Sequence, residues 1–140
     1  MKLPAILCDI DGTIALRGDR DPHAHEHAME DQPNWPVIRT VEAVQRVHGW
    51  RIVLVSARSE KFRDITRYWL WTHRIAGDSV PLFMRKDRDE RPDQEVKKDI
   101  YRAYIEPHYT VQAIFDDRDR VVKMWRELGL PCFQVAEGNY

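Results

Sequence analysis

The sequence predicts an α/β protein with a doubly wound parallel sheet. Short apolar runs typical of buried strands alternate with amphipathic helical segments, and polar side chains follow several of these runs. Strands separated by helices are joined by right-handed crossovers, which make the sheet parallel and cover both of its faces. We therefore expect a Rossmann-like sheet of about five strands in the order 3-2-1-4-5.

The strands are expected where apolar residues cluster between turns. They are residues 5–9, 50–55, 80–84, 111–115 and 132–135. The long segment between the first strand and the first helix, residues 14–35, is polar and contains prolines, so we expect it to be irregular.

The helices are expected where apolar residues recur at helical spacing. The first begins at Pro36 and ends at Gly49. A second covers residues 60–74, with Phe62, Ile65, Trp69 and Thr72 along one face. The third runs from Pro92 to about residue 105, and the last follows Asp117 and continues through Leu128 to Gly129.

Length and composition limit the class of protein. With 140 residues and 43% hydrophobic content, residues 1–140 are expected to form a single domain. A net charge of -1 provides no basic field for extended nucleic-acid binding. Cys8 and Cys132 lie in apolar runs, which favours buried thiols. No apolar segment is long enough for a membrane span or a signal peptide. We expect a cytoplasmic protein.

Two carboxylates at the end of the first strand indicate phosphoryl-transfer chemistry. Asp9 and Asp11 are two residues apart, so in an extended chain both side chains face the same crevice, and Gly12 lets the backbone turn there. Such a pair suits Mg²⁺, which typically takes one or two carboxylates and leaves its other positions to water and phosphate. The alternative is an ordinary acidic turn after a core strand.

Polar residues at the ends of three strands weigh against that alternative. Ser56 and Arg58 follow the second strand, and Asp116 and Asp117 follow the fourth. In doubly wound sheets, ligands bind beyond the carboxyl ends of the strands. We therefore expect these groups to meet at one site.

The ordered set of motifs resembles the haloacid dehalogenase superfamily of phosphatases. The motifs are Asp9-Ile-Asp-Gly-Thr13, Ser56-Ala-Arg58, a lysine at the start of a helix, and Asp116-Asp117. More narrowly, the chain is similar to the 3′-phosphatase domain of phage-type polynucleotide kinase-phosphatases. The segments that carry this narrower resemblance are Arg20-Asp-Pro, Asp31-Gln-Pro-Asn-Trp-Pro-Val, Ile105-Glu-Pro-His-Tyr, Asp116-Asp-Arg, Val121-Val-Lys-Met-Trp-Arg and Gln134-Val-Ala-Glu-Gly.

The chemistry and the resemblance agree on the catalytic roles. Asp9 is expected to be the nucleophile that forms an aspartyl-phosphate, and Asp11 the general acid and then the general base. Ser56 and Lys97 would hold phosphate oxygens, helped by N–H groups around Gly12. Lys97 is chosen over the neighbouring Lys98 only because it matches the position of the lysine in the family's motif. The ligands expected for Mg²⁺ are Asp9, the Asp11 carbonyl and Asp117, with Asp116 beside the ion or as an alternative ligand.

Five further residues are expected to bind the substrate: Gly12, Thr13, Arg20, Arg58 and Asp93. Arg20 and Arg58 would grip phosphate or the neighbouring nucleotide, and Asp93 would orient Lys97 or an arginine. The alternative for Arg20 and Asp93 is that they are solvated surface charges.

The short insertions leave little of a cap domain, so we expect an open site that can take the end of a polymer. Trp35, Tyr68 or Trp71 could stack on a terminal base, whereas Trp69 and Trp125 are expected to pack in the core. His23, His25 and His27 could in principle hold a transition metal, although a solvated loop is the better interpretation.

Three functions remain open from the sequence. The first is a Mg²⁺-dependent phosphatase that removes 3′-phosphate, or by resemblance 2′,3′-cyclic phosphate, from DNA or RNA ends. The others are a phosphatase for free nucleotides or other small phosphomonoesters, and a non-catalytic end-binding module. No phosphate-binding loop of the kinase type occurs, so this chain is not expected to supply the kinase half of the bifunctional enzyme. By the resemblance, a kinase or ligase is expected as a partner or as a domain elsewhere. The helix around Tyr68 and Trp71 could support a homo-oligomer.

Overall fold

Five parallel strands form the central sheet of the computed structural model, which describes residues 1–140. Their spatial order is β5-β4-β1-β6-β7, which is the predicted order 3-2-1-4-5 counted along the chain. The strands are β1 (Leu3–Cys8), β4 (Arg51–Ser59), β5 (Leu82–Arg85), β6 (Tyr109–Asp116) and β7 (Cys132–Gln134).

Strand β1 lies at the centre of the sheet because it is apolar on both of its faces. Ala5 to Cys8 are all buried, and the strand pairs in parallel with β4 on one side and β6 on the other. Its end delivers Asp9 to the carboxyl edge of the sheet, where the Asp9 N–H donates to the Phe115 carbonyl at 3.0 Å. The centre of the sheet therefore carries the first predicted site residue.

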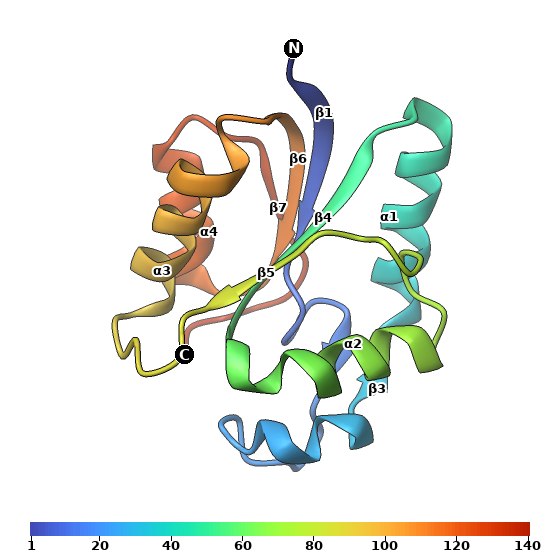
Figure 1. Cartoon of the computed structure of the whole chain (residues 1–140), viewed down its shortest axis with the longest axis vertical. Helices are drawn as coiled ribbons and strands as arrows, with labels where there is room; N and C mark the ends of the chain where they lie inside the picture. Colours follow the sequence, from blue (N-terminus) through green and yellow to red (C-terminus); the bar gives the residue numbers. More distant parts are fainter.

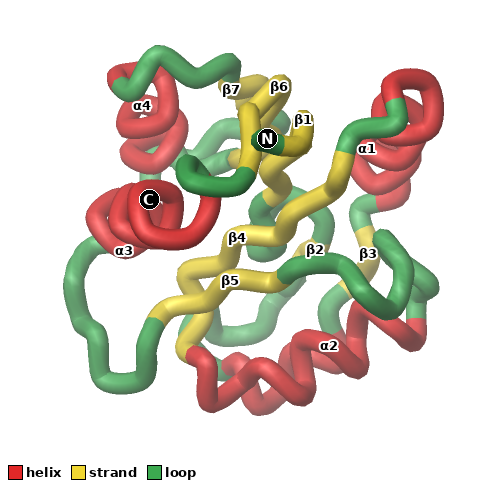
Figure 2. The backbone as a smooth tube through the Cα atoms, turned by 45° about the horizontal axis from the view of Figure 1, so that its top comes forward, coloured by secondary structure: helices red, strands yellow, loops and turns green.

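Two pairs of helices cover the two faces of the sheet (Figures 1 and 2). Helices α1 (Trp35–His48) and α2 (Arg63–Thr72) pack on the face that carries Ile6 and Cys8. Helices α3 (Asp93–Ile100) and α4 (Asp119–Glu127) pack on the face that carries Leu7 and Val53. Because side chains alternate along a strand, β1 supplies both cores. The predicted double winding is confirmed.

Several boundaries differ from those predicted. Strand β4 continues to Ser59, so Ser56 and Arg58 lie within the strand and not after it. Its pairing with β5 shifts register between Ser56 and Ser59, an irregularity that no sequence periodicity reveals. The third predicted helix changes at Tyr101 into a π-helical turn, η3 (Tyr101–Ile105). Helix α1 ends as predicted at Gly49, whose φ of 70° is the left-handed conformation of a helix cap.

The segment between β1 and α1 is more ordered than predicted. It contains a two-stranded antiparallel ribbon, β2 (Ala15–Leu16) with β3 (Gln32–Pro33), and the 3₁₀ segment η1 (His25–Glu30). The indole N–H of Trp69 donates to the Asp31 carbonyl at 2.9 Å, which ties the segment to α2. Contacts distant in sequence fix this segment, so local composition could not predict it.

Both cysteines are free and buried, as predicted. None of the helices has the length and apolar character that a membrane span requires.

Candidate active site

Three carboxylates meet at the carboxyl edge of the sheet. Asp9 follows β1, Asp116 is the last residue of the adjacent strand β6, and Asp117 comes next. One carboxylate oxygen from each lies within 4.8 Å of the others, and all three residues are buried. Parallel pairing of β1 with β6 therefore brings together acidic groups that are more than a hundred residues apart along the chain.

Lys97 provides the positive charge beside these carboxylates. Its ammonium nitrogen lies 2.8 Å from Asp9 Oδ1 and 3.0 Å from Asp116 Oδ2. Val96 and Ile100 anchor this part of α3 in the core, which turns Lys97 inward while Lys98 stays exposed. Burial alone would lower the pKa of Lys97, but Asp116 and Asp9 outweigh it and raise that pKa above its usual value.

The remaining hydrogen bonds hold the carboxylates in place. Thr13, which was predicted to bind substrate, is fully buried, and its Oγ1 donates to Asp9 Oδ2 at 2.9 Å. Asp116 accepts hydrogen bonds from Lys97, from the Trp125 indole at 3.2 Å and from the Asp117 N–H at 2.8 Å. Both oxygens of Asp116 are thus already occupied.

The carboxylate cluster fits a divalent cation. Asp117 Oδ1 is buried and has no hydrogen-bond partner, although it lies beside Asp9. Burial, followed by the charge of Asp116, raises the pKa of Asp9 well above its usual range, and burial also raises the pKa of Asp117. Three carboxylates with one lysine leave excess negative charge, and hard oxygen donors are the ligands that Mg²⁺ prefers.

Gly12 is required for the position of Asp117. Its φ is +81°, and a Cβ at this position would lie only 2.1 Å from Asp117 Oδ2. Its N–H donates to the Ala15 carbonyl at 2.9 Å, so it is not free for the predicted contact with phosphate. Gly12 acts here through its conformation and its lack of a side chain.

Asp11 lies on the other side of Gly12, among basic groups. The Arg58 guanidinium donates to both of its oxygens, at 2.8 and 2.9 Å. Arg20 and the His25 Nε2 approach to 3.6 and 3.8 Å. Burial would raise the pKa of Asp11, but its hydrogen bonds to Arg58 lower that pKa below the usual value. Asp9 and Asp11 therefore have opposite electrostatic environments.

Asp31 holds both arginines and was not identified as a site residue from the sequence. Its buried carboxylate accepts from Arg20 at 2.7 and 2.9 Å and from Arg58 at 3.1 Å. Arg58 is only 1% exposed, and it also donates to Thr66. The two guanidiniums predicted to grip phosphate are thus paired with carboxylates in this structure. Asp31 lies in one of the motif segments, which was the only available signal.

Ser56 lies next to this network. It is completely buried, and its hydroxyl accepts the N–H of Arg58 at 3.1 Å.

Asp93, at the start of α3, is bound by two arginines and not by Lys97. Arg85 donates to it at 2.6 Å, and Arg118 donates to its other oxygen. The alternative that Arg20 and Asp93 are simply solvated charges is therefore wrong.

Tyr140 lies beside Asp117 in the carboxylate cluster, and no sequence motif indicated it. Its hydroxyl donates to Asp117 Oδ2, while its carbonyl accepts from Arg118 at 2.7 Å. The Arg118 guanidinium also lies 4.9 Å from the centre of the Tyr140 ring. The last residues of the chain therefore pack against the carboxylate cluster.

Most of these groups line an open pocket of about 1050 Å³, but the predicted site residues Thr13, Arg20 and Ser56, and also Asp31, lie behind its surface and do not line it. Its walls come from the segment around residues 16–25, from η2 (Glu60–Phe62), from the loop between β5 and α3, and from Tyr140. Trp35, Tyr68 and Trp71 do not line it, so the structure gives no support to their predicted role in base stacking. The rings that do line it belong to His23, His25, Phe62 and Tyr140.

The three histidines do not form a metal site. His23 and His25 face the pocket, whereas His27 lies near Glu30 and is largely exposed. The solvated-loop interpretation therefore fits His27 and not His25, whose side chain is 14% exposed.

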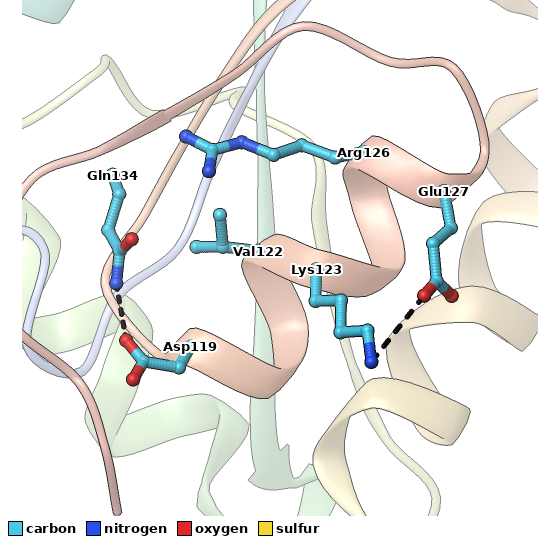
Figure 3. Close-up of a pocket in the computed structure, with 6 residues that line it drawn as sticks. All are labelled: Asp119, Val122, Lys123, Arg126, Glu127 and Gln134. Carbon is cyan, nitrogen blue, oxygen red and sulfur yellow. Dashed lines mark hydrogen bonds and ion pairs between the residues drawn. The ribbon is translucent and has the colours of Figure 1, made fainter.

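A smaller hollow of about 440 Å³ lies over α4 and β7 (Figure 3). Gln134 donates to Asp119 at 2.6 Å across it, and Lys123 pairs with Glu127 at 3.8 Å. None of the predicted site residues lines this hollow. The chemistry is concentrated in the larger pocket.

Comparison with known families agrees with this geometry. Residues 3–140 match the family described as the phosphatase domain of the polynucleotide kinase PNKP. The chain belongs to this family. This phosphatase domain is thus a hydrolase of the haloacid dehalogenase superfamily, as its motifs predicted.

Three relatives place the domain within longer proteins. It is 36% identical over 132 residues to a protein of Autographa californica nuclear polyhedrosis virus that is named as a bifunctional polynucleotide kinase/RNA ligase. It also matches chains in two solved structures of Pnkp1/Rnl/Hen1 complexes, one of them described as an RNA repair complex, with a TM-score of 0.92 and 36% and 37% identity. The match with the viral protein covers 93% of this chain but only 19% of that protein. The matches with the two solved chains each cover 99% of this chain, and 48% and 44% of those chains.

Proposed function

We propose that this domain removes the 3′-phosphate from DNA or RNA ends in a Mg²⁺-dependent reaction. One observation supports this most: Asp9 lies beside Asp117 and Lys97 at the floor of a pocket that is open to solvent. A nucleophilic carboxylate needs neighbouring positive charge to approach a phosphate dianion. Membership of the PNKP phosphatase family supports the same reaction class.

In the proposed reaction, Asp9 attacks phosphorus and the bond between phosphorus and the 3′-oxygen breaks. Asp11 gives its proton to the departing oxygen, so the products are a 3′-hydroxyl end and an aspartyl-phosphate on Asp9. A water molecule then attacks phosphorus while Asp11 takes its proton, which releases inorganic phosphate and restores the Asp9 carboxylate. Lys97 and Ser56 would stabilise the charge on the transferring oxygens.

The cation would be held by Asp9, the Asp11 carbonyl and Asp117, with Asp116 fixing the positions of Lys97 and of the Asp117 backbone. When bound, it would offset the negative charge of the carboxylates and of the incoming phosphate.

Arg58 must loosen its hold on Asp11 before Asp11 can carry a proton. A phosphate dianion arriving beside Asp11 raises the pKa of that carboxyl, and it also offers the guanidinium another partner. Asp31, 3.1 Å from Arg58, keeps the guanidinium in place during this exchange. This reconciles the lowered pKa of Asp11 with its predicted role as the acid.

The open pocket favours a polymer end over a small metabolite, because no cap domain closes over it. The names of the relatives, which join polynucleotide kinase and RNA ligase, suggest a kinase or ligase as the partner or attached domain. A ligase would use the 3′-hydroxyl end that this reaction produces.

The test is release of inorganic phosphate from a 3′-phosphorylated oligonucleotide, made as DNA and as RNA, with Mg²⁺ or with EDTA. We expect turnover only with Mg²⁺, and a loss of at least about 1000-fold in the Asp9→Asn variant, since a neutral amide is a poor nucleophile. The same oligonucleotide carrying only a 5′-phosphate is the matched control and should release none.

Full activity of Asp9→Asn would refute the nucleophile assignment. Faster turnover of free 3′-mononucleotides than of the oligonucleotide would instead favour the small-molecule alternative. No turnover of any substrate, with retained binding of the oligonucleotide, would favour the non-catalytic module.

A further inference from the structure

Two aromatic rings from separate elements meet at one wall of the pocket. His25 begins η1 and Phe62 ends η2, and their ring centres lie 5.4 Å apart at an interplanar angle of 71°. Both rings line the pocket, and the Lys61 ammonium lies 5.1 Å from the centre of the Phe62 ring. Edge-to-face contact keeps the two rings in fixed relative positions.

The hydrophobic cores do not explain Phe62. It belongs to neither of the two core clusters, and it is not among the half-buried apolar residues that pack against them. It is half-buried at the margin of the pocket. A large apolar ring kept at the edge of a charged pocket is typical of a surface that receives an apolar or aromatic ligand group.

The position of these rings relative to Asp11 indicates which ligand group they meet. His25 Nε2 lies 3.8 Å from Asp11 Oδ2, so a continuous path leads from Asp11 through His25 to Phe62. If Asp11 protonates the leaving oxygen, as in the proposed function on which this step rests, the departing sugar lies beside Asp11. The base on that sugar would then lie on the side of the pocket that His25 and Phe62 form.

The other rim of the pocket is charged, and three of its arginines are already paired with carboxylates. Arg85 and Arg118 bind Asp93, and Arg91 binds Asp89 and Asp99. The ring of Tyr140 is engaged by Arg118, and its hydroxyl by Asp117. Among the aromatic rings that line the pocket, His25 lies 3.8 Å from Asp11 and Phe62 packs against it, so this pair is best placed to accept a base.

We propose that Phe62 and His25 form a subsite for the base of the 3′-terminal nucleotide. The base stacks on this wall without strong sequence preference, since every base has an aromatic face. The subsite makes the enzyme select a phosphate attached to a nucleoside over one attached to a bare sugar.

The test compares two oligonucleotides of identical sequence that end in a 3′-phosphate. One ends in an ordinary nucleotide, and the other ends in an abasic tetrahydrofuran residue. The quantity measured is the ratio of kcat/KM for the first to kcat/KM for the second, which is independent of the fraction of folded enzyme. We expect a ratio of about 10 or more in the wild type and a ratio near one in Phe62→Ala, in the range that alanine substitution gives for base stacking.

Two further variants keep the test decisive. Phe62→Leu retains apolar volume without the aromatic face, so its ratio should also fall. Trp71→Ala removes an aromatic ring that is 62% exposed and lies outside the pocket, so its ratio should equal that of the wild type. A wild-type ratio near one, or a wild-type ratio in both Phe62 variants, would overturn the subsite while leaving the 3′-phosphatase reaction intact.

Binding separates failure of the subsite from failure of the reaction. Fluorescence anisotropy of the two oligonucleotides with Asp9→Asn, and with Asp9→Asn combined with Phe62→Leu, needs no turnover. Loss of the preference for the ordinary nucleotide in the double variant supports the subsite even if the wild type hydrolyses neither oligonucleotide. Equal preference in both proteins overturns it.

Discussion

Replacing Lys97 with methionine would leave two buried carboxylates without their cation. Lys97 is 2% exposed and lies 2.8 Å from Asp9 and 3.0 Å from Asp116. Removing one partner of a buried ion pair costs about 3–5 kcal/mol. The variant can also relieve the unpaired charge by protonating one of the two carboxylates, and the cost of doing so is an upper bound on its loss of stability. At about pH 7.5, protonating an aspartate of ordinary pKa costs about 5 kcal/mol. The two values agree, and for a chain of this size they correspond to a fall in Tm of roughly 10–15 °C.

The measurement is thermal unfolding in EDTA, followed by circular dichroism at about pH 7.5 and about pH 5.5. The folded variant takes up one proton more than the folded wild type, and the unfolded chains of both hold the same number of protons. Its deficit in unfolding free energy should therefore shrink by about 1.4 kcal/mol per pH unit, to about 2 kcal/mol at the lower pH. The matched control is Lys98→Met, because Lys98 is exposed and should leave Tm nearly unchanged.

A deficit below about 1 kcal/mol at the higher pH would contradict this reasoning, and so would a deficit that does not depend on pH. Either result would mean that Lys97 does not neutralise the two carboxylates in solution.

Two further predictions concern the proposed cation. Gly12→Ala places a methyl group 2.1 Å from Asp117 Oδ2 at a φ of +81°, so it should displace the Asp117 carboxylate. Mg²⁺ affinity, measured by calorimetry, should therefore fall at least about 10-fold. Wild-type affinity in a folded variant would show that Asp117 is not a ligand. In the wild type, Mg²⁺ affinity should fall as pH is lowered, by up to about 10-fold per pH unit for each proton displaced, because the pKa values of Asp9 and Asp117 are both raised and the ion must expel their protons. Titrations between about pH 5.5 and 8 that give a constant affinity would argue against this cluster as the ligand set.

The strand order and the convergence of the acidic groups could be predicted from the sequence. Apolar runs separated by helices imply a parallel sheet, and a parallel sheet has all of its carboxyl ends at one edge. Asp9 and Asp117 therefore had to be near one another wherever β1 and β6 are adjacent. The assignment of catalytic roles and of a single domain over residues 1–140 remains a prediction.

The aromatic residues show where sequence reasoning failed. Helical spacing from Phe62 to Thr72 suggested one buried face, but a 3₁₀ turn, η2, precedes α2 and changes the phase of the first residues. Phe62 thus reaches the pocket, while Thr72 is exposed. Trp35, Tyr68 and Trp71 were predicted to stack on a terminal base because they are aromatic, but only the three-dimensional path of the chain decides which rings reach the site.

The packing of Tyr140 against Asp117 has a practical consequence for handling this protein. An affinity tag attached after Tyr140 would begin beside the carboxylates that the cation needs. Met1 is fully exposed and precedes β1, at the opposite edge of the sheet (Figure 1). Purification handles and surface-immobilisation chemistry therefore belong at Met1.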